Sequence, residues 1–122
     1  MSFAAPLCYA SPMDWLVPLE TFREALAREA ATSAVGLRRG TMRIILLAPG
    51  SVQPQAPHDQ DELYIVLQGA GIFDKAGDKR PVAEGDVLFV EAGVPHGFTD
   101  VTEGFEAYAV FWGPKGGEQV SY

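Results

Sequence analysis

Glycine-containing turns divide most of this chain into short strands, and this pattern limits the fold more than any other feature. Within one strand, Glu62, Tyr64 and Val66 alternate with Leu63 and Ile65 at the two-residue period of a β-strand. Strands are predicted at 41–48, 52–56, 62–68, 72–75, 80–83, 87–90, 96–99 and 105–112. Short strands at roughly ten-residue spacing are typical of a sandwich or barrel, so an all-β domain is expected.

The 122 residues suit a single domain, and 13 glycines with 9 prolines favour tight turns over long helices. One helix is predicted early in the chain, where Thr21 and Glu24 have capping-box spacing and Phe22, Ala25 and Leu26 recur on one face. The expected organisation is an N-terminal arm and helix over 1–34, a barrel over 35–113 and a loose tail over 114–122.

Charge, cysteine usage and hydropathy limit the partners and the location expected for this chain. Nine basic against sixteen acidic residues give a net charge of −7, which disfavours nucleic acid and anionic lipid as partners. Arg38, Arg39 and Arg43 are interpreted as a solvated strand face without a functional role. The single cysteine, Cys8, has no partner for an intrachain disulfide. No membrane span or secretory signal is recognised, so a cytoplasmic location is expected.

Two histidines occur in the chain, and each stands close to the start of a predicted strand. Taken alone, a histidine is more often a structural residue than a ligand. Their surroundings, however, resemble the two motifs of the cupin superfamily. The first match comprises Gly50, His58, Glu62 and Gly69, with Ala56 where the family has another histidine. The second comprises Gly85, Gly93 and His96, with Glu91 and Asp100 where the family usually has proline and asparagine.

The resemblance implies a jelly-roll β-barrel in which the motif residues meet on a divalent metal ion. His58, Glu62 and His96 correspond to metal ligands of the family, and the fourth ligand is missing at Ala56. Two imidazoles and one carboxylate form the facial triad of non-haem iron(II), and the same set can hold Zn, Mn, Co or Ni. The metal is therefore expected to be a divalent ion of undetermined identity.

Three further residues are candidates for a substrate pocket. Gln55 lies next to the missing ligand, although the prolines around it make its orientation unpredictable. Tyr64 follows Glu62 on the same strand face, where its hydroxyl is a candidate proton shuttle or an ordinary barrel-lining group. Phe98 shares a face with His96. For the final strand, the sequence does not show whether Phe111 or Trp112 faces inward.

The leading hypothesis is a metal-dependent enzyme acting on a small organic acid, ketone or phenol, with dioxygenase as the first subclass. Isomerase or lyase activity stays open, because the fold hosts all three kinds of chemistry. The alternative from another class is a non-catalytic binding or sensor cupin. A homodimer is expected, since cupins often pair through sheet edges and the apolar N-terminal arm needs a surface to cover.

Overall fold

The computed structural model describes residues 15–30, 32–48, 53–55 and 57–120, with the side chains of 53–55 excepted. The expectations for Cys8, for the arm before Trp15, for Gly50 and for Ala56 lie outside the described residues. The described chain forms one helix and nine strands: α1 (Leu19–Glu29), β1 (Ser33–Arg39), β2 (Met42–Leu47), β3 (Gln53–Gln55), β4 (Asp61–Gln68), β5 (Ala70–Lys75), β6 (Asp78–Ala83), β7 (Val87–Val90), β8 (His96–Thr99) and β9 (Glu106–Trp112).

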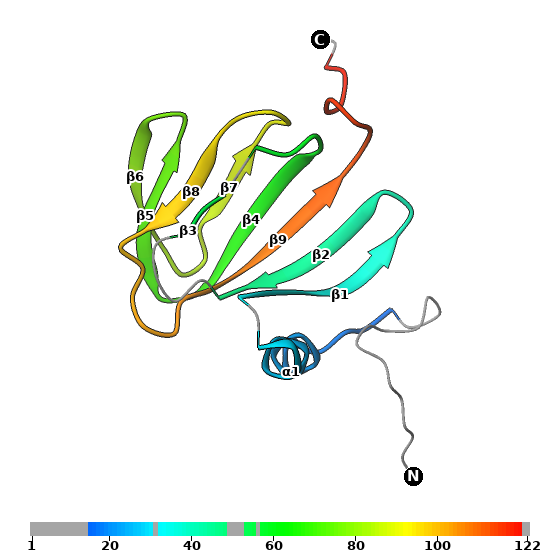
Figure 1. Cartoon of the computed structure of the whole chain (residues 1–122), viewed down its shortest axis with the longest axis vertical. Helices are drawn as coiled ribbons and strands as arrows, with labels where there is room; N and C mark the ends of the chain where they lie inside the picture. The colour runs from blue at the N-terminus through cyan, green and yellow to red at the C-terminus, as the bar shows by residue number, and fades with distance from the viewer. Residues whose placement is uncertain (1–14, 31, 49–52, 56, 121–122) are drawn as a thin grey trace.

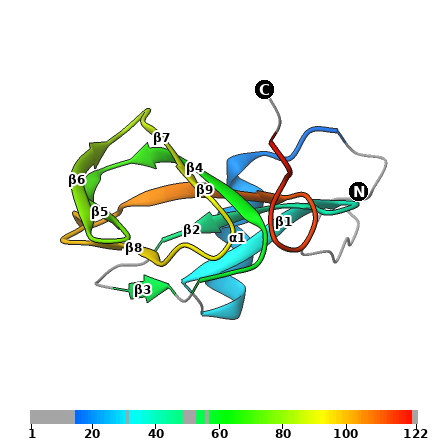
Figure 2. The same cartoon turned by 90° about the horizontal axis from the view of Figure 1, so that it is seen from above.

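The strands form two sheets that face each other as layers (Figures 1 and 2). The five-stranded sheet has the order β1-β2-β9-β4-β7, and the four-stranded sheet has the order β3-β8-β5-β6. Neighbouring strands are antiparallel throughout. This arrangement confirms the predicted all-β jelly roll with a short N-terminal helix.

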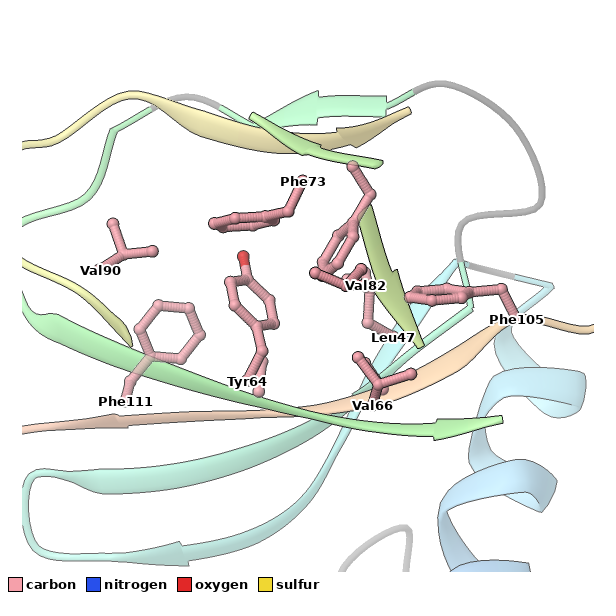
Figure 3. Packing of buried hydrophobic residues seen from close by; sticks show 11 residues of the cluster. Leu47, Tyr64, Val66, Phe73, Val82, Val90, Phe105 and Phe111 are labelled. Atoms are coloured by element: carbon pink, nitrogen blue, oxygen red, sulfur yellow. The ribbon is translucent and has the colours of Figure 1, made fainter. Parts of the chain in front are cut away.

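The interior between the sheets is filled by alternate residues of each strand. On β4, Tyr64 and Val66 are buried while Ile65 between them is partly exposed. On β9 the inward set includes Phe111, and Trp112 faces outward, which answers the question that the sequence left open. Figure 3 shows aromatic rings from both sheets pointing into the space between them. The core is therefore aromatic where the two layers meet.

Helix α1 packs on the outer face of the five-stranded sheet, beside β1 (Figure 1). Its buried residues are Phe22 and Ala25, while Leu26 of the predicted apolar face is only partly buried. The Phe22 ring meets the ring of Tyr108 at 5.1 Å between centroids. The predicted capping box is wrong. The helix begins at Leu19, Pro18 occupies the N-cap position and no side chain caps the first turn. Pro18 is extended (φ −63°, ψ 148°) and its carbonyl accepts the Thr21 amide at 3.0 Å, so Thr21 lies within the first helical turn and not ahead of it as a cap.

The segment after β9 is tied to the start of β4. The amide of Gly116 donates to the Asp59 carbonyl (2.6 Å), and the amide of Glu118 donates to the Asp61 carboxylate (3.0 Å). Asp61 also accepts the amide of Ala92 at 3.0 Å and is only 7% exposed. Asp61 is therefore a buried acceptor that joins the C-terminal segment to the turn after β7.

No helix in the described part of the chain has the length and apolarity needed to cross a bilayer.

Candidate metal centre

Three side chains that the sequence motifs single out come together inside the barrel. Glu62 extends inward from β4, His96 from the first residue of β8, and His58 from the segment that leads into β4. One ligand atom of each lies within 4.8 Å of the others. Residues far apart in the chain thus form one compact His/Glu/His group.

The carboxylate of Glu62 lies between the two imidazoles. Its Oε1 atom is 2.6 Å from His58 Nε2 and 3.0 Å from His96 Nε2. The two rings meet edge to face, with centroids 4.9 Å apart. Both Nε2 atoms and one carboxylate oxygen therefore converge on the same point.

Backbone carbonyls orient both rings. His58 Nδ1 lies 3.0 Å from the carbonyl oxygen of Gln60, and His96 Nδ1 lies 2.9 Å from that of Val94. A carbonyl only accepts, so each Nδ1 carries the proton and donates it. In the neutral ring this leaves the Nε2 lone pair directed at Glu62, which is the orientation found in metal-binding histidines.

This donor set fits a divalent cation. Two neutral Nε2 atoms and a carboxylate oxygen are all acceptors, so their close approach needs a proton or a cation between them. Glu62 is fully buried, and its Oε2 atom has no hydrogen-bond partner among the described residues. A buried carboxylate oxygen without a partner is costly, and a metal ion would satisfy it. The set of N and O ligands suits Fe, Zn, Mn, Co or Ni.

A proton can occupy the same place when no metal is bound. Burial lowers the pKa of His96, but the hydrogen bonds to Glu62 and to the Val94 carbonyl, together with the Glu62 charge, outweigh burial and raise this pKa above its usual value. A proton and a metal ion would therefore compete for the same place.

The group opens to solvent on the side of His58. The His58 side chain is 19% exposed, whereas those of Glu62 and His96 are at most 1% exposed. A cavity of about 510 Å³ borders His58 and is walled by Asp59, by the turn after β7 at Ala92 and by Gly116 of the C-terminal segment. Solvent or a ligand entering this cavity meets the His58 edge of the group first.

A larger cavity, about 680 Å³, lies elsewhere, between the edge strands β6 and β7. Phe73 and Val94 line it and also contact His96, with the Phe73 ring 6.0 Å from the His96 ring. The His/Glu/His group itself does not line this cavity. The three side chains that could bind a metal ion lie in the His/Glu/His group, so we assign the site to this group rather than to the larger cavity.

The three candidate pocket residues have different surroundings. The Tyr64 hydroxyl lies 3.0 Å from His96 Nε2, inside the barrel. Phe98 is 1% exposed and packs against the rings of Tyr64, Phe73 and Phe105, so its part in a pocket stays a prediction. Gln55 pairs with His96 in the β3–β8 register, and its side chain lies outside the described residues.

Sequence reasoning missed two features in and beside the site. The carbonyls of Gln60 and Val94 orient the histidines, and backbone groups leave no signal in residue identity. Arg43 was interpreted as part of a solvated face, but it pairs with the inward-facing Phe111 and lies over its ring, 4.4 Å from the centroid. The inward-facing parity of 43 could have been found only by aligning β2 with β9.

Comparison with known proteins decides the family. The family model of the cupin domain matches residues 43–112, more than half of the chain. This chain belongs to the cupin family. A cupin-sized stretch of 81 residues is also 36% identical to the uncharacterised protein SCO3923 of Streptomyces coelicolor, covering 65% of this chain and 77% of that protein.

Solved structures share the cupin fold at lower identity. A Cupin 2 conserved barrel domain protein from Salinispora arenicola has a TM-score of 0.58 and 22% identity, over 66% of this chain and 74% of that one. HppE, solved in its FeII form with substrate, has a TM-score of 0.56 and 21% identity, over 66% of this chain and 52% of that one. At such identity these likenesses establish the cupin fold only.

Proposed function

We propose that this cupin binds one divalent metal ion through His58, Glu62 and His96 and uses it to act on a small organic molecule. The observation that carries the proposal is the convergence of both Nε2 atoms on Glu62 Oε1, with each Nδ1 held by a carbonyl. The two imidazole rings are thus already oriented to coordinate a metal ion, which lowers the free-energy cost of forming the site.

A metal-dependent oxygenase is the function that this ligand set supports best. Two histidines and one carboxylate are typical of non-haem iron(II) oxygenases, and the bound ion would supply a Lewis acid with open positions for substrate and dioxygen. HppE, whose structure shares the cupin fold, was solved with FeII and offers a precedent for iron(II) in this fold. In this chain, Glu62 supplies the negative charge, while Phe111 and Tyr64 screen the group from bulk water.

Lyase or isomerase chemistry is the second candidate, and Tyr64 favours it. Its buried hydroxyl lies beside His96 Nε2. There a phenol can donate a proton to a molecule held at the metal or accept one from it. Such a reaction needs proton transfer and no dioxygen. The sensor alternative needs neither.

Oxygen uptake separates these possibilities. Protein reconstituted anaerobically with iron(II) is exposed to air-saturated buffer with small acids, ketones and phenols, and dissolved oxygen is followed with an electrode. We expect at least one compound to raise uptake about ten-fold or more above a His96→Ala control. Substrate loss without uptake supports the lyase or isomerase. Tight binding of a compound with neither oxygen uptake nor loss of that compound would contradict catalysis and support a sensor.

A further inference from the structure

Arg43 is a positively charged side chain on the inner face of the barrel. In the register of the five-stranded sheet it pairs with Phe111 on β9, and Phe111 pairs with Glu62 on β4. Paired residues share a face, so Arg43, Phe111 and Glu62 form one row across the interior. Two strand spacings separate the Cα atoms of Arg43 and Glu62 by about 10 Å. Arg43 therefore stands in the same inward row as Glu62, with Phe111 between them.

The charge of Arg43 has no counterpart among the described residues. Arg23 and Lys75 are also partly exposed, and each binds a carboxylate at 2.8 Å, from Glu106 and Glu91 respectively. Arg43 has no carboxylate within 4.0 Å in the described part of the chain, and its polar contact is a long 3.4 Å approach to Gln60 Oε1. A guanidinium carries five N–H donors, so the single contact to Gln60 leaves Arg43 with further donors for an anionic ligand.

Arg43 and His58 share the same two neighbours. The ring of Phe111 has Arg43 Cζ over it at 4.4 Å and meets the His58 ring edge to face at 4.7 Å. Gln60 approaches Arg43 with its side chain and accepts the His58 Nδ1 proton with its carbonyl. The Gln60 amide is fixed in turn by hydrogen bonds to the carbonyls of Thr41 and Gly113, both 3.0 Å. The guanidinium is thus positioned relative to the metal group rather than free in solvent.

The geometry points to Arg43 as the anchor for a carboxylate on the molecule that this cupin binds. A guanidinium matches a carboxylate with two parallel N–H donors, and an apolar ring behind it reduces competition from water. The ligand would be a small organic acid whose carboxylate lies at Arg43 while an oxygen at its other end reaches the metal. This inference rests on the proposed metal site and adds the substrate class: an anion rather than a neutral ketone or phenol.

Binding of matched acid and amide pairs tests the anchor directly. Glycolate and 4-hydroxybutyrate are titrated by calorimetry into metal-loaded protein, alongside their neutral amides, after the metal content of each variant has been measured. In the wild type at least one acid should bind about ten-fold or more tightly than its amide. Arg43→Gln should remove that preference without changing metal content, and Arg43→Lys should keep part of it.

Arg39→Gln is the matched control, because Arg39 comes from the same basic group but is exposed on β1. It should bind the acids as the wild type does. Equal affinity for acid and amide in the wild type, or an unchanged preference in Arg43→Gln, would overturn the inference. If the wild type binds no metal, the proposed function fails instead. The same titration on metal-free protein then still tests Arg43, which must favour acid over amide by its charge alone.

Discussion

Tyr64 is the residue whose structural and chemical roles can be separated most cleanly. Its ring packs against Phe73 and Phe98, and its hydroxyl lies 3.0 Å from His96 Nε2. Tyr64→Phe keeps the ring and removes the hydroxyl. The protein should lose about 1 kcal/mol of stability, because one buried hydrogen bond disappears.

Metal content should be unchanged in Tyr64→Phe, because the phenol is not one of the proposed ligands. If Tyr64 moves a proton during the reaction, kcat should fall at least ten-fold with little change in KM. Tyr108→Phe, on the outer face, is the control. Loss of metal from Tyr64→Phe would contradict this assignment, since it would make the hydroxyl part of the ligand set.

At the scale of single residues, the sequence predicted the His/Glu/His group but not the backbone carbonyls that orient its histidines. His58, Glu62 and His96 were identified because their surroundings resemble the two cupin motifs, and the structure brings these three residues together. The carbonyls of Gln60 and Val94 could not be identified in this way, because every residue has one. Arg43 was overlooked because its inward face depends on how β2 pairs with β9, and pairing between distant strands is not encoded locally.

Among the elements, α1 is held on the sheet by a close approach at Gly36 of β1. A Cβ atom built on Gly36 would overlap the ring of Phe22. Gly36→Ala should therefore displace that ring and destabilise the protein by about 1–3 kcal/mol, measured by denaturant unfolding. Metal content should be unaffected, because α1 lies outside the barrel.

A double-mutant cycle checks that cause. Phe22→Ala alone should cost about 3–5 kcal/mol, and adding Gly36→Ala to it should cost much less than it does in the wild type, because the ring is already gone. Strictly additive losses would show that the two residues do not meet as described.

The elements were predicted unevenly, for physical reasons. The strands at 87–90 and 96–99 were predicted at their observed bounds, because the turn at Gly85 precedes the first and the turn ending at Pro95 separates the two. The strand Ser33–Arg39 was not delimited, since Gly36 and two arginines mask its alternation and the register shifts at that glycine. The helix was expected from its apolar face, but its start was misplaced, because it begins at Leu19, ahead of the hydroxyl of Thr21 that was predicted to cap it.

For the molecule as a whole, the outer face of the five-stranded sheet is the surface most suited to a partner. It carries partly exposed apolar residues on three adjacent strands, and Val87 and Phe89 on the edge strand β7 are 62% and 44% exposed. Exposed apolar patches of this kind commonly mark protein interfaces. The homodimer expected from the sequence stays a prediction, and we place its interface on this face.

Light scattering after gel filtration tests the dimer. The wild type should have about twice the mass of one chain at micromolar concentration, and Phe89→Asp should halve it, because a two-fold interface meets the substitution from both sides. Val120→Asp, which replaces another exposed apolar side chain on the C-terminal segment, should leave the mass unchanged. A wild type of single-chain mass would contradict the prediction.

Metal binding by the His/Glu/His group underlies every functional proposal made for this protein, and metal analysis tests it most directly. Protein purified without chelator or an affinity-nickel step, then incubated with iron(II), zinc or manganese and desalted, is measured by plasma mass spectrometry. The wild type should retain about one ion per chain of at least one metal, and His58→Ala, Glu62→Gln and His96→Ala should each lose most of it. Tyr108→Phe should retain the wild-type amount. Full metal content in both histidine variants would show that the ion binds elsewhere and would contradict the proposed site.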